Sequence, residues 1–163
     1  IAGAGGGALI VGAVFLVLSP ESDRRHLTVH LDRAGVSAAD VRLLSCPHDR
    51  VVDHLCAADV GLLLRERHPM NEVAAPGKFA EYALSGLPIV MTEGIGDFSA
   101  AMRDAPLACV LPDLAAADVN ERIQRFCARD FDVTQRAESS RWAAERFAVE
   151  LAIPRIAALY RGV

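Results

Sequence analysis

Lysine is almost absent from this sequence. The chain carries 17 basic residues, and Lys78 is the only lysine, so all the others are arginines. GC-rich coding, which favours arginine and alanine, explains the bias. It does not explain where the one remaining lysine stands.

An excess of positive charge is also lacking. The formal net charge is -4 and the pI is near 5.7, which argues against a nucleic-acid binder that works by phosphate neutralisation.

No CxxC pair occurs among the cysteines, which are Cys46, Cys56, Cys109 and Cys127. A disulfide framework is the less favoured alternative, and we expect reduced thiols in a cytoplasmic protein.

Charge is missing altogether from residues 1–18. This run barely reaches the length of a membrane span, its five glycines make a poor helix, and it has no basic segment of the signal-peptide kind. Residues 3–8 fit the GxGxxA dinucleotide fingerprint, but only two residues precede them, too few for the required strand. We predict a lead-in of uncertain structure over residues 1–12.

Apolar sequence is abundant: 52% of the 163 residues are hydrophobic, enough for one domain to bury a core. Short apolar runs alternate with helical segments. Strands are predicted at 13–18, 41–45, 60–64, 87–91 and 107–111. Helices are predicted at 21–34, 49–58, from Pro76 to a stop at Gly86, and at 98–104, 117–128, 134–148 and 149–161. The stretch 65–75 is predicted to be a loop.

This alternation predicts an α/β fold: a Rossmann-like, doubly wound parallel sheet with C-terminal helices, occupying residues 13–163. In such folds, ligands bind beyond the carboxyl ends of the strands. The loops of interest are therefore 19–21, 46–49, 65–76 and 92–97.

The one lysine stands at the start of a predicted helix in the third of these loops. Pro76 suits a first helical turn, and Gly77 leaves the backbone approachable for an anion at the helix N-terminus. Lys78 adds a positive charge, and Glu81 follows on nearly the same helix face. These residues fit a nucleotide-diphosphate site, in which Glu81 accepts hydrogen bonds from ribose hydroxyls. The alternative is an ordinary Lys–Glu surface pair.

The same region resembles the donor-binding half of GT-B glycosyltransferases. The nearest group is the bacterial group 1 (family 4) enzymes of surface-polysaccharide synthesis. The resemblance combines a strand, a loop and a helix in register. It rests on Asp59-Val60-Gly61-Leu62-Leu63-Leu64-Arg65, on Asn71, and on Ala75-Pro76-Gly77-Lys78-Phe79-Ala80-Glu81-Tyr82-Ala83-Leu84-Ser85-Gly86-Leu87-Pro88-Ile89-Val90.

The resemblance implies roles for individual residues. Lys78 would contact the donor diphosphate, and Glu81, matching the second glutamate of the EX7E motif, would bind the ribose. The first glutamate of that motif falls on Val73, so the sugar contact differs from the common pattern. Arg65 and Asn71 would bind phosphate or sugar.

The donor base would stack near Cys46 and His48. The implied reaction transfers a sugar from a UDP- or GDP-type donor with retention of configuration. Lys78, Arg65 and the helix start at Gly77 would stabilise the leaving group, with no metal and no cofactor.

The resemblance also implies a partner domain. Catalysis in GT-B enzymes takes place between two halves, so we expect the chain to be incomplete without an N-terminal acceptor-binding domain. The arginines of the C-terminal helices are expected to form a solvated face: Arg136, Arg141, Arg146, Arg155 and Arg161. The alternative is a basic face that meets anionic lipid, with peripheral membrane association of the full-length protein. Two alternatives stay open: another GT-B enzyme such as a nucleotide-sugar 2-epimerase, and a non-catalytic nucleotide-binding module.

Overall fold

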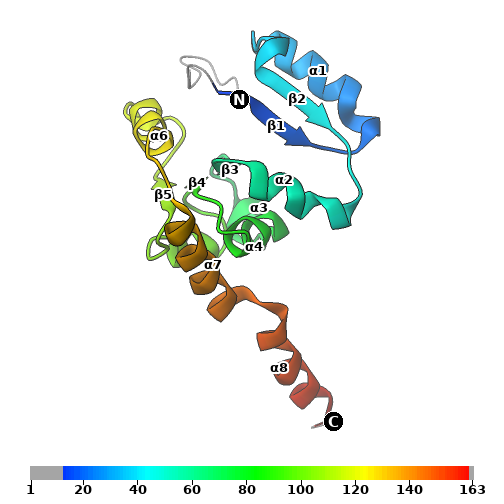
Figure 1. The fold of residues 1–163 in the computed structure, drawn as a ribbon, viewed down its shortest axis with the longest axis vertical. Helices are drawn as coiled ribbons and strands as arrows, with labels where there is room; N and C mark the ends of the chain where they lie inside the picture. The colour runs from blue at the N-terminus through cyan, green and yellow to red at the C-terminus, as the bar shows by residue number, and fades with distance from the viewer. Residues whose placement is uncertain (1–12, 162–163) are drawn as a thin grey trace. The chain divides into compact units, whose positions relative to one another are not determined.

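The computed structural model describes residues 13–161. The predicted lead-in over residues 1–12, with its GxGxxA sequence, lies outside the described residues. Contacts divide the chain into two compact units, Ile1–His54 and Leu55–Val163, which Figure 1 shows in blue to cyan and in green to red. That both belong to one donor-binding domain stays a prediction.

The first unit is a parallel β–α–β arrangement. Strand β1 (Phe15–Leu18) pairs with β2 (Val41–Leu44), with Phe15 opposite Val41, and helix α1 (Arg24–Arg33) connects them. Single 3-10 turns lie at Glu21–Asp23, Ala38–Asp40 and His48–Arg50. Gly35 ends α1 with a φ of 69°, a conformation open to glycine at little cost.

The second unit is built on a three-stranded parallel sheet in the order β3-β4-β5. Its strands are β3 (Gly61–Leu63), β4 (Ile89–Thr92) and β5 (Ala108–Leu111). All four residues of the central strand are buried, as expected where helices cover both faces of a sheet. The five predicted strands are confirmed, and hydrogen bonds join them as two parallel sheets among the described residues.

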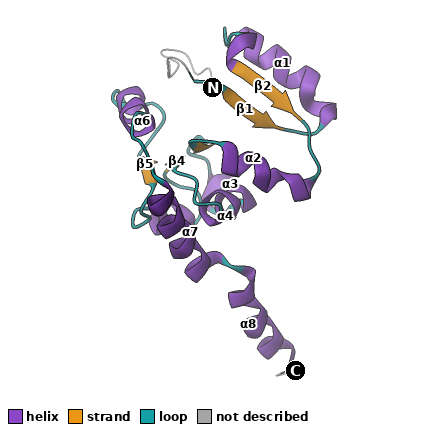
Figure 2. Cartoon of the chain, viewed as in Figure 1, coloured by secondary structure: helices purple, strands orange, loops and turns teal. Residues whose placement is uncertain are grey.

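Helices follow the strands, as Figure 2 shows. They are α2 (Val51–Ala57), α3 (Pro69–Glu72), α4 (Gly77–Leu84), α5 (Phe98–Met102), α6 (Val119–Cys127), α7 (Val133–Phe147) and α8 (Val149–Arg161). The prediction that 65–75 is entirely a loop is wrong, because α3 lies within it. Pro69 occupies its first turn, and the His68 ring accepts a hydrogen bond from the Met70 N–H, which caps the helix.

Helix α4 is anchored to α7 in the second unit. Phe79 is fully buried, with ring centroids 4.7 Å from Phe98 and 5.1 Å from Phe147. The Ser140 hydroxyl donates to the Leu84 carbonyl at 2.6 Å. This packing fixes the inner face of the helix that carries Lys78.

The C-terminus of α4 confirms the predicted stop at Gly86. Its φ is 66°. A Cβ at this position would lie 3.0 Å from the carbonyl carbon of Arg136 in α7, and closer to the oxygen. Glycine is therefore required here both by the backbone conformation and by the close approach of two helices.

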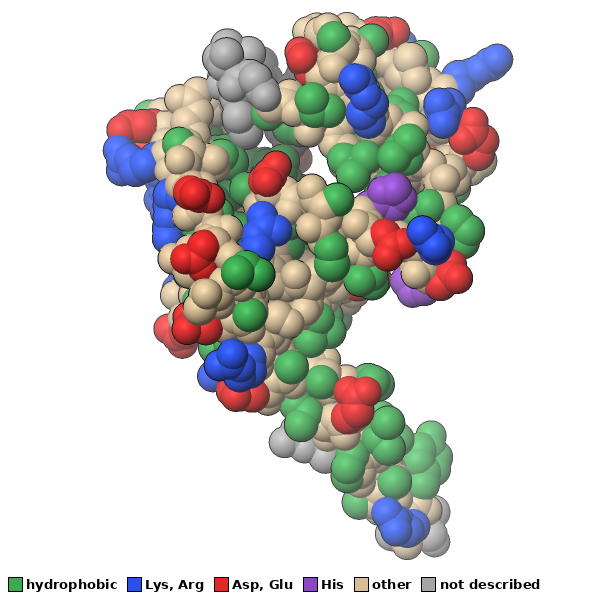
Figure 3. All heavy atoms as spheres, in the orientation of Figure 1, with side chains coloured by type: hydrophobic (Ala, Val, Ile, Leu, Met, Phe, Trp, Pro, Cys, Tyr) green, Lys and Arg blue, Asp and Glu red, His purple; other side chains and the backbone are tan. Residues whose placement is uncertain are grey.

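Helix α8 leaves most of its apolar side chains in solvent, and Figure 3 shows them along the lower end of the molecule. Leu159 is 74% exposed and Tyr160 is 82% exposed. Helix α7 contacts α8 near their junction. Within residues 13–161, no helix is both long and apolar enough to cross a membrane.

Candidate functional site

The carboxyl edge of the second sheet is organised around Arg65. Arg65 lies two residues beyond β3, and Thr92 is the last residue of β4. The Thr92 hydroxyl accepts a hydrogen bond from the Arg65 N–H at 3.0 Å and donates to the Arg65 carbonyl at 2.8 Å. Thr92 is only 2% exposed, so this double contact is shielded from water and fixes the backbone of Arg65.

The Arg65 side chain has its own partner. Its guanidinium Nη1 donates to Asn71 Oδ1 at 3.0 Å, and Asn71 Nδ2 donates to the Glu66 carbonyl at 2.7 Å. The structure thus brings together two residues predicted for the site. Both ends of the Asn71 amide form hydrogen bonds within the loop. Direct contact of Asn71 with phosphate or sugar stays a prediction.

A second loop packs against the first. The Gly96 N–H donates to the Asn71 carbonyl at 3.0 Å, and a Cβ on Gly96 would fall within 3.0 Å of the Ala74 carbonyl oxygen. Gly94 and Gly96 both have positive φ, 74° and 47°. The predicted loop 92–97 therefore contacts the Arg65–Asn71 loop backbone to backbone.

The N-terminus of α4 is open. Pro76 is the N-cap, and no side chain in the described part of the chain caps the helix. Among the described residues, apart from its chain neighbours and the nearby backbone of its own helix, nothing lies within 4 Å of the position that a Cβ on Gly77 would take. The Lys78 side chain is exposed. The uncapped N–H groups, the helix dipole and the ammonium group together favour an anion here.

Neither predicted phosphate-binding cation is neutralised within the described residues. Lys78 and Arg65 form no ion pair in that part of the chain. In particular, Lys78 and Glu81 do not form the surface pair that was the alternative interpretation. Glu81 is half-buried, and burial, followed by the negative charge of Glu81, raises the pKa of Tyr82.

Two predicted base-binding residues belong to the first unit. Cys46 follows β2 and is half-buried, whereas His48 is exposed and begins a 3-10 turn. Both stand beyond the carboxyl end of a parallel strand, as the prediction required. Their role in holding a base stays a prediction.

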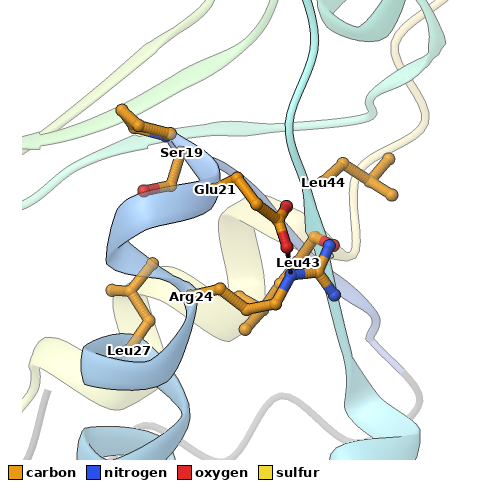
Figure 4. A pocket seen from close by; sticks show the side chains of 7 residues that line it. Ser19, Glu21, Arg24, Leu27, Leu43 and Leu44 are labelled. Atoms are coloured by element: carbon orange, nitrogen blue, oxygen red, sulfur yellow. Dashed lines mark hydrogen bonds and ion pairs between the residues drawn. The ribbon is translucent and has the colours of Figure 1, made fainter.

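A small hollow in the first unit lies at the carboxyl ends of β1 and β2, and Figure 4 shows the side chains that line it. The Arg24 guanidinium pairs with the Glu21 carboxylate at 2.9 Å and donates to the Leu43 carbonyl at 3.3 Å. The hollow offers about 10 Å³, room for roughly one water. With its cation paired and so little space, it does not suit a nucleotide.

Candidate metal ligands do not gather in residues 13–161, where no group of three or more His, Cys, Asp or Glu is placed to hold an ion. An Asp-x-Asp sequence is present at 130–132. Its second aspartate, Asp132, caps the N-terminus of α7. The Asp132 carboxylate accepts a hydrogen bond from the Gln135 N–H at 2.8 Å, and the Gln135 side-chain oxygen accepts one from the Asp132 N–H. This capping box engages the Asp132 carboxylate.

Comparison with known proteins gives a fold. No family model matches the chain, and no curated protein matches it. Among solved structures, it is similar to that of AviGT4, a glycosyltransferase involved in avilamycin A biosynthesis, with a TM-score of 0.63 and 18% identity. The chain therefore shares the Rossmann-like α/β fold of the matched part of that structure, and the predicted fold class is confirmed. The likeness covers 91% of this chain and 42% of AviGT4, so the chain spans less than half the length of that structure.

Proposed function

We propose that the chain is the donor-binding domain of a glycosyltransferase that moves a sugar from a UDP- or GDP-type donor to an acceptor. Two features that follow β3 along the chain carry the proposal: Arg65, which forms no ion pair among the described residues, and the N-terminus of α4, which bears Lys78 and has no side-chain cap there. In a β–loop–α unit of a parallel sheet, the strand end and the next helix start share one edge, so both cations serve that edge.

Each residue has a role in this proposal. Lys78, Gly77 and the α4 N-terminus hold the diphosphate, with Pro76 setting the helix start. Arg65 adds a second positive charge that stabilises the departing nucleoside diphosphate. The Glu81 carboxylate accepts hydrogen bonds from the ribose. Retention of configuration belongs to the resemblance and is part of the proposal.

The proposal also includes a second domain. The chain spans 42% of the similar structure, and α8 exposes apolar side chains such as Leu159. Exposed apolar surface of this kind marks an interaction site, and we propose that another protein domain covers it. We therefore expect an acceptor-binding domain to complete the catalytic site.

One observation favours the epimerase or non-catalytic alternative. Val73 stands where the resemblance has its first glutamate, and its side chain is 81% exposed and apolar. It can offer no hydrogen bond to a sugar hydroxyl. Product analysis with the donor sugar, acceptor and complete protein separates transfer from epimerisation and from binding without turnover.

Calorimetry with UDP and GDP tests the binding step. We expect saturable binding of at least one nucleotide, weakened about tenfold or more by Lys78→Ala and by Glu81→Ala, since each removes a charge-assisted hydrogen bond. Arg141→Ala is the matched control, because it removes an exposed cation from α7. If the unmodified chain binds neither UDP nor GDP, the proposal is contradicted.

A further inference from the structure

Arg65 is held at two points, by one side chain at its backbone and by another at its guanidinium. We propose that Thr92 and Asn71 are positioning residues that preorganise Arg65 to bind a phosphate group. This inference rests on the proposed function, because that function supplies the phosphate. It adds a role for Thr92, which no motif predicted.

The Thr92 hydroxyl forms the hydrogen bonds that a strand neighbour would otherwise offer to the main chain of Arg65. The β3–β4 pairing ends at Leu63 opposite Met91, so the main chain of Arg65 lies beyond the ladder. The Thr92 hydroxyl bonds both the N–H and the C=O of Arg65, extending the sheet by one side chain. A buried hydroxyl with its donor and acceptor both used rigidifies its partner.

Asn71 orients the guanidinium without consuming its charge. An amide oxygen is a neutral acceptor, whereas an aspartate at this position would pair with Arg65 and neutralise it. Asn71 is itself fixed at two points, by its bond to the Glu66 carbonyl and by the bond from Gly96 N–H to its own carbonyl. The acceptor therefore stays in place when no ligand is bound.

The guanidinium keeps most of its hydrogen-bonding capacity. It has five N–H groups, and its one side-chain bond within residues 13–161 goes to Asn71. The remaining donors and the full charge suit a bidentate phosphate contact. Holding this group before binding reduces the entropy lost on association, so Thr92 and Asn71 increase the affinity for phosphate through Arg65.

Two substitutions at Thr92 separate positioning from packing. Thr92→Val keeps the shape but loses both hydrogen bonds, and Thr92→Ser keeps the hydroxyl. We expect Thr92→Val to weaken binding of UDP or GDP about tenfold, and Thr92→Ser to stay within about twofold of the unmodified chain. Binding of uridine or guanosine, which lack phosphate, should not change. Asn71→Leu serves as a second variant on a less buried residue, should Thr92→Val fail to fold.

The decisive measurement is the same pair of substitutions in an Arg65→Ala background. A positioning role predicts that Thr92→Val and Asn71→Leu cause no further loss of nucleotide affinity there, because they act through Arg65. A purely structural role predicts the same loss in both backgrounds, and that result overturns the inference. So does full affinity in the single variants, which leaves the proposed function standing. If the unmodified chain binds neither UDP nor GDP, both fall together.

Discussion

The orientation of α4 depends on Gly86, and replacing that residue gives a sharp test of the architecture beneath the site. Gly86 has a φ of 66° and closes the helix that carries Lys78 and Glu81. The Cβ of Gly86→Ala would lie 3.0 Å from the carbonyl carbon of Arg136, with the oxygen closer still. We expect this substitution to destabilise the protein strongly.

The magnitude follows from two costs. Alanine in a left-handed conformation costs about 1–2 kcal/mol. Crowding a methyl group against a packed backbone costs about 1–3 kcal/mol more. Helix α7 cannot retreat freely, because Ser139 and Ala143 on it are 5% and 0% exposed. The free energy of unfolding should therefore fall by about 2–5 kcal/mol.

Urea denaturation followed by tryptophan fluorescence measures this loss. Trp142, the sole tryptophan, is half-buried on α7, the helix that contains Arg136. Gly77→Ala is the matched control: its added methyl meets no atom within 4 Å, and alanine favours a helix by up to about 1 kcal/mol. If Gly86→Ala unfolds at the same urea concentration as the unmodified chain, the packing of α4 on α7 is not as described.

Two further predictions concern the thiols and the cap of α7. Burial raises the pKa of the Cys109 thiol above its ordinary 9.0. Burial, followed by the charge of Cys109, raises the pKa of the Cys127 thiol in the same direction. The neutral thiols therefore contribute fully to the unfolding free energy below pH 9, and this contribution is lost as pH rises through the folded-state pKa values. The unfolding free energy should thus decline above pH 9, and less so in the Cys109→Ala, Cys127→Ala double variant; an equal decline refutes the assignment. Asp132→Ala should cost about 1 kcal/mol in urea denaturation, whereas the exposed Asp130→Ala should cost under about 0.5 kcal/mol; equal losses would contradict the capping role.

Local signals predicted the ends of several elements. Gly35 and Gly86 stop their helices because a residue with positive φ is needed just past a C-terminus, and glycine adopts it without strain. Pro76 precedes α4 as its N-cap, one position before the first helical position that proline favours, so the predicted helix start differs by one residue. Helix α3 was missed because 65–75 has no apolar periodicity, and the cap at His68 and the contact of Asn71 with Gly96 stabilise it instead.

Long-range pairing placed the rest of the site. Thr92 and Arg65 are 27 residues apart, and only the parallel alignment of β3 with β4 brings the hydroxyl to that backbone. Asn71 was predicted to bind phosphate or sugar. Whether an asparagine faces a phosphate or an arginine depends on how its loop folds. The sequence placed the one lysine at a helix start and indicated an α/β fold, because periodicity and capping act within a few residues.

The tertiary structure decided which charges remain available. Arg24 is paired with Glu21 and bonded to a backbone carbonyl, whereas Arg65 is oriented by a neutral amide and keeps its charge. Composition treats these arginines alike, although Arg24 begins α1 and Arg65 lies in the loop beyond β3. The Glu21–Arg24 pair is local, but the Leu43 carbonyl that also binds Arg24 is 19 residues away in the sequence. Asn71, which orients Arg65, is held in turn by Gly96 from a separate loop, so these partners are set by the packed chain.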